Sequence, residues 1–390
     1  MTEAVLRVEH PALMFRRLGG MGVLERQLFL LAAAGIRRVT VTAAHPPEAD
    51  RMRRPEGLEM IWAAEESGSP ADIQTPQLQY CADYLVRRET LEAILAGTSE
   101  GYVVYQDEAA RDVLRLSASA GAAAGSELRS MPAGSYVRLP EQSPGPADRR
   151  WLLDGARKGH DGFMARVFDR HLSLAVTRWL LETPLKPNHM TLISSAIGVL
   201  GAAQFARPGR AGNVAGALLV WLHTVLDGCD GEMARLRYQE SRFGGVLDFW
   251  GDNVVHVALF TAIGLGVAAQ NGAAWPLVLG IVAAAASLAA ATLTYRISAA
   301  KRAESEAGPF FKGLPLETPA SGGARTLQRI EDALTQRDFI YLLVGLALVG
   351  RLDIFLIAAG IGTPIFFLVL LYLTFQSGAR RAETPIRGPQ

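Results

Sequence analysis

The sequence has little of what marks a disulfide-stabilised secreted protein or a nucleic-acid-binding protein. Only two cysteines, Cys81 and Cys229, occur in 390 residues, too few for a disulfide framework. The N-terminus lacks the charged and then apolar pattern of a secretory signal peptide, so we expect none. The formal net charge is only +1. Because no global electrostatic field favours nucleic acid, we expect no nucleic-acid partner.

Hydrophobic residues make up 49% of the chain but are distributed unevenly. The first 150 residues are typical of a soluble α/β domain, whereas the remainder contains six apolar runs. A helix needs about 20 mostly apolar residues to cross a bilayer. The second run reaches that length if its helix continues through the acidic sequence after it, and the fifth if it begins near Thr335. The runs cover residues 190–206, 213–226, 246–269, 273–295, 339–351 and 353–376.

Four aspartates, Asp227, Asp230, Asp248 and Asp252, lie in one short stretch flanked by apolar runs. Their i, i+3 and i, i+4 spacings place each pair on one face of its own helix. Carboxylates near hydrocarbon are costly, and four that converge repel one another. Hard divalent cations, which take oxygen ligands, would hold them together. The pattern therefore predicts a site for two divalent cations, Mg²⁺ or Mn²⁺.

Small residues and one cation lie between the two aspartate pairs. Gly231, Ala234 and Gly244 allow a ligand to approach the backbone, and Arg235 offers a forked cation suited to phosphate. The combination favours a metal-bound pyrophosphate. Ordinary helix-end or paired acids of a solvated loop would not need this arrangement.

The complete pattern, Asp-x-x-Asp-Gly-x-x-Ala-Arg, eight residues, then Gly-x-x-x-Asp-x-x-x-Asp, resembles the signature of the CDP-alcohol phosphotransferases. A second family-like feature, Pro-Asn-x-x-Thr at residues 187–191, precedes the first apolar run. The resemblance covers about residues 150–380 and implies an integral membrane enzyme with six transmembrane helices. Such enzymes cleave the pyrophosphate of a CDP-linked donor, release CMP and attach the phospho-group to an alcohol.

The resemblance also implies roles for the residues that match. Asp252 contacts the second metal and is the general base that removes the proton of the acceptor hydroxyl. The family further suggests a homodimer formed through membrane helices. The implied metal ligands are Asp227, Asp230, Asp248 and Asp252, and the implied CDP-binding residues are Asn188, Thr191, Gly231, Ala234, Arg235 and Gly244.

Three functions could explain these features. The leading hypothesis is an enzyme of phospholipid biosynthesis that uses CDP-diacylglycerol and a small polar alcohol or alcohol phosphate. The alternative within the class uses a polar donor such as CDP-inositol with a polyol phosphate acceptor. A divalent-cation transporter could use the acids as an ion site, but it leaves Arg235 and the small residues unexplained. An inactive scaffold is disfavoured because all four aspartates are present.

Residues 1–142 are predicted to form the soluble α/β domain. Residues 18–42 resemble the interior of sugar-phosphate nucleotidyltransferases, with a glycine-bearing turn, a helix and a strand. Residues 1–17 contain no glycine, whereas an active enzyme has a glycine-rich loop there that cradles phosphates. Asp107, after a strand at 101–105, is either a metal-binding acid or an ordinary strand-end acid. We expect an inactive domain that serves stability, assembly or regulation.

A proline-containing boundary is expected at 143–148, followed by an amphipathic juxtamembrane segment at 150–186 and the membrane domain at 187–380. The basic amphipathic segment would lie on the membrane surface or pack on the soluble domain. Lys and Arg are dense in the loops that would lie on one side of the membrane and sparse in the loops on the other side. The positive-inside rule places both termini and the aspartates in the cytoplasm, with the helices in the cell inner (plasma) membrane.

Several other polar residues lie near the aspartates. His223 and His256 fall within apolar runs, where a buried, hydrogen-bonded histidine is the expected role. Glu232 is expected to be solvated or to make an auxiliary contact. Four later cations serve as positive-inside anchors or contact a phosphate, namely Arg296, Lys301, Arg302 and Arg337.

Overall fold

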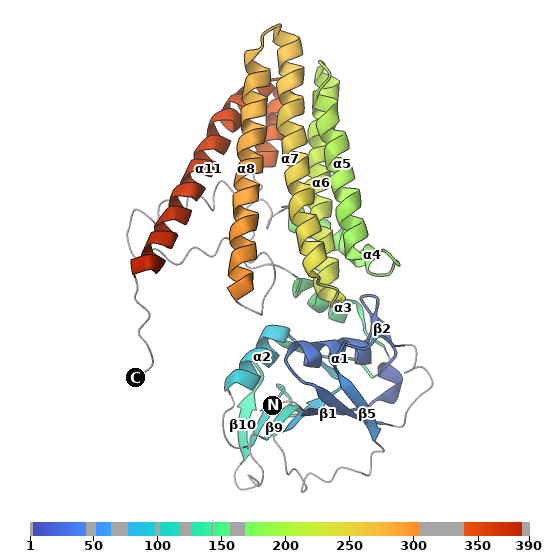
Figure 1. Ribbon diagram of the computed structural model, residues 1–390. Helices are drawn as coiled ribbons and strands as arrows, with labels where there is room; N and C mark the ends of the chain where they lie inside the picture. Colours follow the sequence, from blue (N-terminus) through green and yellow to red (C-terminus); the bar gives the residue numbers. More distant parts are fainter. Residues whose placement is uncertain are drawn as a thin grey trace. The chain divides into compact units, whose positions relative to one another are not determined.

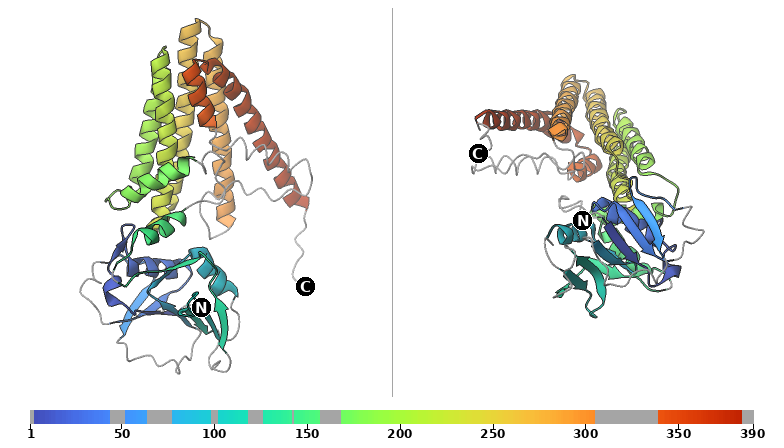
Figure 2. Two further views of the ribbon diagram at one scale, coloured as in Figure 1. Left: turned by 180° about the vertical axis from the view of Figure 1, so that it is seen from behind. Right: turned by 60° about the horizontal axis from the view of Figure 1, so that its bottom comes forward.

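The computed structural model describes residues 3–43, 52–63, 77–97, 102–117, 126–141, 143–156, 168–304 and 339–383. The chain divides into two compact units (Figures 1 and 2). The first comprises Met1–Arg157, Leu181–Thr183 and Leu236–Tyr238, and the second comprises Lys158–Leu180, Pro184–Arg235 and Gln239–Gln390. The predicted change from an α/β region to a helical region is confirmed. Some residues named above lie outside the described ranges, namely Thr335, Arg337 and the Ala/Gly/Ser-rich residues 118–125. The side chains of Lys301 and Arg302 are also not described.

A seven-stranded sheet, ordered β10-β8-β9-β6-β1-β4-β5, forms the centre of the first unit. All neighbouring pairs are parallel except those of β9, which is antiparallel to both β6 and β8. Alternate residues of the inner strands, such as Leu6, Val39 and Val41, are fully buried, as expected for a sheet covered by helices. The strands are β1 (Glu3–Arg7), β4 (Arg38–Thr42), β5 (Glu59–Ala63), β6 (Gln77–Cys81), β8 (Tyr102–Gln106), β9 (Asp112–Ser117) and β10 (Ser126–Ser130).

Two short antiparallel pairs and several helices complete the first unit. Helix α1 (Val23–Ala33) occurs where the sequence predicted a helix, and Gly35, with φ of +90°, ends that segment in a conformation that favours glycine. Helix α3 (Pro146–Asp154) begins within the expected boundary at 143–148, with proline at its first position, where it is tolerated. The other elements are β2 (Arg17–Leu18), β3 (Met21–Gly22), β7 (Tyr84–Val86), β11 (Tyr136–Arg138), η1 (Pro11–Leu13) and α2 (Arg88–Gly97).

The second unit is helical. Helices α5, α6, α7 and α8 run alongside one another (Figure 1), and α7 packs along both α5 and α8, whereas α11 packs on α8. Phe205, Leu259 and Leu356 belong to its buried apolar core. Its helices are α4 (Arg170–Leu180), α5 (Pro187–Phe205), α6 (Arg210–Leu236), α7 (Arg242–Asn271), α8 (Trp275–Glu304), α10 (Phe339–Val349) and α11 (Leu352–Glu383).

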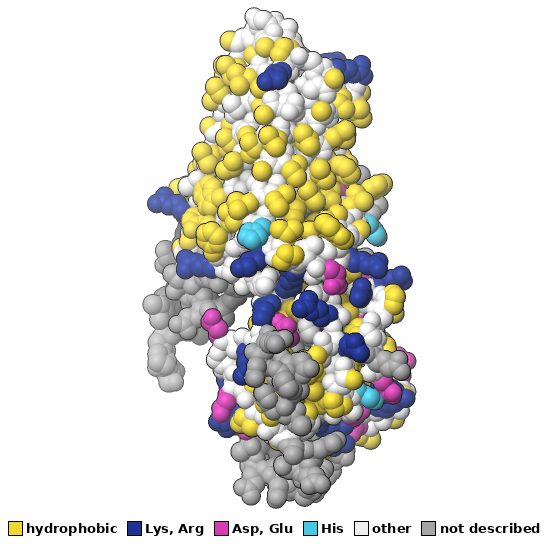
Figure 3. All heavy atoms as spheres, turned by 90° about the vertical axis from the view of Figure 1, so that its right-hand side faces the viewer, with side chains coloured by type: hydrophobic (Ala, Val, Ile, Leu, Met, Phe, Trp, Pro, Cys, Tyr) yellow, Lys and Arg dark blue, Asp and Glu magenta, His cyan; other side chains and the backbone are white. Residues whose placement is uncertain are grey.

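Six of these helices, α5 to α8 with α10 and α11, occur where the six spans were predicted. Three are long and apolar enough to cross a bilayer: α7, α8 over Trp275–Ala300, and α11 over Leu352–Gln376. Helix α6 is long, but its last turns carry the charged motif, and α10 is short. On the face in Figure 3, hydrophobic side chains form a broad band over the helical unit. Such an exposed apolar surface is typical of a membrane protein.

Glycines allow α5 to approach its neighbours closely. A Cβ atom on Gly216 of α6 would lie 2.7 Å from the carbonyl oxygen of Gly201 on α5. One on Gly266 of α7 would lie 1.8 Å from the carbonyl oxygen of Phe205, also on α5. No larger residue fits at Gly266 without moving backbone. These contacts fix α5 against the two helices that carry the aspartates.

Candidate metal and phosphate site

The structure brings the four predicted aspartates together from two helices. Asp227 and Asp230 on α6 are each 5% exposed, and Asp248 and Asp252 on α7 are half-buried. Ligand oxygens of Asp227, Asp230 and Asp248 all lie within 4.8 Å of one another. A second group consists of His223, Asp227 and Asp252, whose ligand atoms also all lie within 4.8 Å of one another. Asp227 belongs to both groups, as a carboxylate shared by two neighbouring cations would.

Local sequence explains how the acids come to face one another. Helix α6 continues through the motif to Leu236, as predicted, so Asp227 and Asp230 project from one face. Ser241 caps the next helix, because its Oγ accepts a hydrogen bond from the backbone N–H of Gly244 at 3.0 Å. Helix α7 therefore begins at Arg242, so Asp248 and Asp252 lie in its first three turns. Buried carboxylates in this arrangement fit hard divalent cations and are unfavourable without them.

Two predicted nucleotide-pocket residues come from the start of α5. The hydroxyl of Thr191 donates a hydrogen bond to a carboxylate oxygen of Asp230, so Thr191 contacts a predicted metal ligand. Asn188 lies against Gly244, where an added Cβ atom would be 2.8 Å from its Oδ1 atom. Glycine at 244 therefore makes room for the Asn188 amide, and helices α5, α6 and α7 all contribute to the site.

Arg235 lies one helical turn after Gly231. A Cβ atom on Gly231 would be 3.0 Å from Nη1 of Arg235, so the guanidinium folds back over the glycine. Arg235 and Ala234 are both half-buried. The arrangement places a forked cation within one or two turns of Asp227 and Asp230. A ligand bridging cations and guanidinium would need several anionic oxygens, as a pyrophosphate has.

Glu232 is fully buried, so of its two expected roles the solvated one is wrong and the auxiliary contact is the one that the structure supports. Its carboxylate accepts hydrogen bonds from Nη1 of Arg170 at 2.6 Å, Oγ of Ser173 at 2.7 Å and Oγ1 of Thr177 at 2.6 Å. All three donors lie on one face of α4, and their i, i+3 and i+7 spacing was the available sequence signal. Glu232 therefore fastens α4 to the motif.

The opposite face of α4 is exposed and carries apolar side chains beside the basic residues His171 and Arg178. Leu172 is 40% exposed and Trp179 is 69% exposed. Exposed apolar side chains interleaved with basic ones on one helix face are typical of a helix at a membrane surface. This arrangement favours the membrane-surface interpretation of the juxtamembrane segment.

His223 is 4% exposed and hydrogen-bonded, as the sequence predicted. Its Nδ1 atom lies 2.9 Å from the carbonyl oxygen of Ser194, and its Nε2 atom lies 3.5 Å from Oδ1 of Asp252. The proximity to Asp252 was missed in the sequence. The signal was the i, i+4 spacing between His223 and Asp227, which places the imidazole on the acidic face of α6.

Of the four later cations considered in the sequence, Arg296 has a described side chain. That side chain lies on α8 and is exposed.

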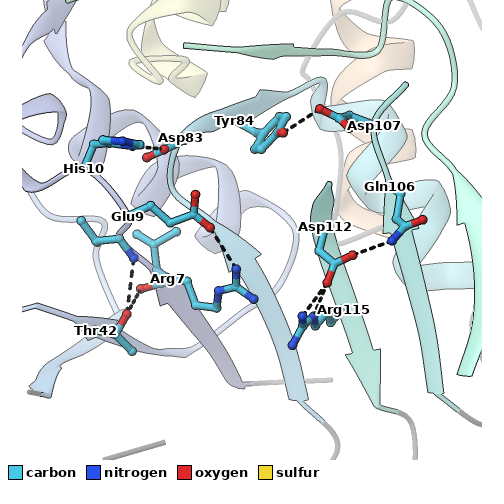
Figure 4. Close-up of polar contacts among 12 residues, drawn as sticks. Arg7, Glu9, His10, Thr42, Asp83, Tyr84, Gln106, Asp107, Asp112 and Arg115 are labelled. Carbon is cyan, nitrogen blue, oxygen red and sulfur yellow. Dashed lines mark hydrogen bonds and ion pairs between the residues drawn. The ribbon is translucent and has the colours of Figure 1, made fainter. Parts of the chain in front are cut away.

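In the first unit, Asp107 stabilises a turn (Figure 4). Its carboxylate accepts hydrogen bonds from the backbone N–H groups of Ala109 at 2.9 Å and Arg111 at 2.8 Å, and from the Tyr84 hydroxyl at 2.8 Å. Burial opposes the charged form, but these hydrogen bonds outweigh it and lower the pKa of Asp107. The geometry supports the strand-end interpretation of Asp107.

Comparison with known proteins agrees with the motif. The CDP-alcohol phosphatidyltransferase family model matches residues 185–321. The chain is 36% identical over 134 residues to a bifunctional IPC transferase and DIPP synthase of Rubrobacter xylanophilus, covering 33% of this chain and 29% of that protein. It is 33% identical over 101 residues to the phosphatidylinositol phosphate synthase of Mycobacterium tuberculosis, covering 26% and 46%. The matches thus span less than half of each relative.

Solved structures give a weaker similarity. The crystal structure of the Mycobacterium tuberculosis phosphatidylinositol phosphate synthase with CDP-DAG bound is 19% identical, with a TM-score of 0.35 over 56% of this chain and 98% of that chain. The same synthase in complex with manganese and citrate gives 20% identity and a TM-score of 0.34, over 56% and 92%. The matched family region contains the four aspartates and Arg235. Residues 185–321 of this chain are thus similar to the CDP-alcohol phosphatidyltransferase family, and the similarity includes the site described above.

Proposed function

We propose that this protein transfers a substituted phosphate group from a CDP-linked donor to the hydroxyl of an alcohol and releases CMP, in phospholipid biosynthesis. The observation that carries the proposal is the convergence of four aspartates, in two groups that share Asp227, beside a guanidinium folded over Gly231. The family match favours this enzyme over a divalent-cation transporter.

Asp227, Asp230 and Asp248 would hold one divalent cation, and Asp227 and Asp252 would contact a second, either Mg²⁺ or Mn²⁺. When bound, such cations neutralise the pyrophosphate and stabilise charge on the attacking and leaving oxygens. Arg235 binds phosphoryl oxygens, and the small residues Gly231 and Ala234 let the CDP group approach α6. The nucleotide is bordered by Asn188 and Thr191 from α5 and by Gly244 from α7.

Asp252 acts as the general base in this proposal. Its carboxylate takes the proton of the acceptor hydroxyl while the acceptor oxygen forms a bond to the donor phosphorus. The bond from that phosphorus to the bridging oxygen breaks, and CMP leaves with the oxygen. Asp252 is only partly buried, with 20% of its side chain exposed, which suits a group that must meet an incoming alcohol.

CDP-diacylglycerol is the donor that the helical unit favours. An open apolar groove of about 600 Å³ lies along α7, between α5 and α8, and includes Trp250 and Asn253, which flank Asp252 in the sequence. An acyl chain would fit this apolar lining. The lining includes Val199, Trp250, Val254, Val257, Leu265 and Leu288. A polar donor such as CDP-inositol, with a polyol phosphate acceptor, would make no use of this apolar groove.

The membrane arrangement follows from the same proposal. All six predicted spans would cross the cell inner (plasma) membrane, with the site and both termini in the cytoplasm. Two copies would associate through their membrane helices. The α/β domain would serve stability, assembly or regulation rather than nucleotidyl transfer, because residues 3–17 provide β1, η1 and the start of β2 without a glycine-rich loop.

The test is CMP release by the purified protein in detergent with Mg²⁺ or Mn²⁺. CDP-diacylglycerol and CDP-inositol would each be offered with a panel of alcohols and polyol phosphates. We expect metal-dependent release with CDP-diacylglycerol that is lost in Asp252→Asn. CMP release with CDP-inositol but not with CDP-diacylglycerol would show that the donor is the polar one. Release that persists without divalent metal would contradict the mechanism.

A further inference from the structure

We propose that His223 supplies a nitrogen ligand to the second cation of the site, the one that Asp227 and Asp252 contact. This inference rests on the proposed metal-dependent function. It assigns the two cations different surroundings, with carboxylates from Asp227, Asp230 and Asp248 around the first, and a nitrogen beside two carboxylates around the second. The ligand atoms of His223, Asp227 and Asp252 all lie within 4.8 Å of one another.

The hydrogen bond on the other side of the ring determines which nitrogen is free to bind a metal. Nδ1 of His223 lies 2.9 Å from the carbonyl oxygen of Ser194, which can only accept, so Nδ1 carries the proton. In the neutral imidazole, Nε2 then presents a lone pair toward Asp252. Metal-binding histidines almost always donate their other N–H in this way, often to a backbone carbonyl.

The distance between the two side chains also fits a shared cation. Nε2 of His223 is 3.5 Å from Oδ1 of Asp252. That separation is long for a direct N–H···O hydrogen bond. Two ligand atoms that each lie about 2.1 Å from one cation are separated by roughly 3.0 to 3.5 Å, for bond angles between the octahedral and tetrahedral values.

The imidazole is held in place by close packing. A Cβ atom on Gly198 would lie 2.9 Å from Cγ of His223 and 2.7 Å from Cγ2 of Val255, so glycine at 198 leaves space that the ring occupies. The buried ring is anchored to α5 by Ser194 and is one helical turn from Asp227. A ligand fixed in advance loses little conformational freedom when the cation binds.

The ligand set has a consequence for metal preference. Mg²⁺ favours oxygen ligands and water, whereas Mn²⁺ binds imidazole more readily. A mixed nitrogen and oxygen site therefore prefers Mn²⁺, while the all-carboxylate site accepts either ion.

The test is pulsed electron paramagnetic resonance of Mn²⁺ bound to the full-length protein in detergent. A directly bound imidazole gives a ¹⁴N coupling, and protein made with ¹⁵N-labelled histidine should show ¹⁵N coupling instead. We expect the signal in the wild type and in His256→Gln, a control that changes another histidine of the helical unit. His223→Gln should lose the signal and bind the second Mn²⁺ at least about tenfold more weakly.

The outcomes separate this inference from the proposed function. Wild-type protein that binds Mn²⁺ without a histidine coupling would refute the nitrogen ligand but keep the carboxylate site, as would a coupling that persists in His223→Gln. Wild-type protein that binds no Mn²⁺ would overturn the metal-dependent function itself. The isotope comparison uses unmodified sequence, so it decides the question even if His223→Gln does not fold.

Discussion

Thr191, at the start of α5, donates its hydroxyl to a carboxylate oxygen of Asp230 on α6. A predicted nucleotide-pocket residue thereby orients a predicted metal ligand. Hydrogen-bonding partners of metal ligands restrict the ligand's orientation and adjust its basicity. The contact gives the Pro-Asn-x-x-Thr sequence a physical reason to accompany the aspartates, although the two lie on different helices.

Replacing Thr191 by valine tests this relationship. Valine keeps the shape but removes the hydroxyl, so Asp230 loses a donor and the affinity for Mn²⁺ or Mg²⁺ should fall by roughly 10- to 100-fold. Thr191→Ser retains the hydroxyl and should retain most of the affinity. Metal dependence of CMP release and direct Mn²⁺ binding would both be measured. Equal metal affinity in Thr191→Val and the wild type would show that the hydrogen bond does not position Asp230.

Arg235→Lys tests the phosphate role of the guanidinium. Lysine keeps the charge but cannot make two parallel hydrogen bonds, and its point charge would not fold over Gly231 in the same way. We expect kcat/KM for the CDP-linked donor to fall roughly 10- to 100-fold, since hydrogen bonds to charged groups contribute about 1.5–3 kcal/mol. The exposed Arg207, which follows the C-terminal end of α5, offers the matched control, because Arg207→Lys should leave kcat/KM unchanged. An equal effect of both substitutions would point to loss of general positive charge.

Sequence predicted the parts of the site that depend on one helix. The spacings of Asp227, Asp230, Asp248 and Asp252 fix which residues share a face, and the structure brings them together. Contacts between helices were not predictable in the same way. The pairing of Thr191 with Asp230 depends on how closely glycine contacts allow α5 to approach its neighbours.

Helix positions were predicted better than helix lengths. Apolar patterns located α5 to α8, α10 and α11, and the continuation of α6 through the motif was expected, but α6 begins at Arg210, before its apolar run, and α10 ends at Val349, before the end of its own. Glu232 illustrates the difficulty. A glutamate between Gly231 and Met233 looks solvated until α4 supplies three donors to its carboxylate.

Glu232→Ala tests whether this buried cluster stabilises the helical unit. The change removes the carboxylate that Arg170, Ser173 and Thr177 share, and loss of one partner of a buried ion pair typically costs about 3–5 kcal/mol. We expect a clearly lower midpoint of thermal unfolding in detergent, with a smaller decrease for Glu232→Gln. The exposed Glu240, also near the motif, provides the control Glu240→Gln. A wild-type midpoint in Glu232→Ala would mean that the cluster contributes no net stability.

The N-terminal unit makes a separate prediction about pH. His10 and Asp83 form a hydrogen-bonded pair after β1 and β6 (Figure 4), and this hydrogen bond raises the pKa of His10 above its ordinary value of 6.5. Because the folded state binds the proton more tightly, the added stability is present below pH 6.5 and disappears as pH rises through the folded-state pKa.

His10→Gln should therefore destabilise the protein more at about pH 5.5 than at about pH 8.5. Thermal unfolding of the full-length chain would be measured at both pH values, and His171→Gln, which changes an exposed histidine of α4, controls for general effects of losing an imidazole. The pairing of His10 with Asp83 predicts that only His10→Gln shows the larger loss at low pH. A loss that grows with pH instead would mean that the neutral imidazole, not the imidazolium, is the form that the folded unit stabilises.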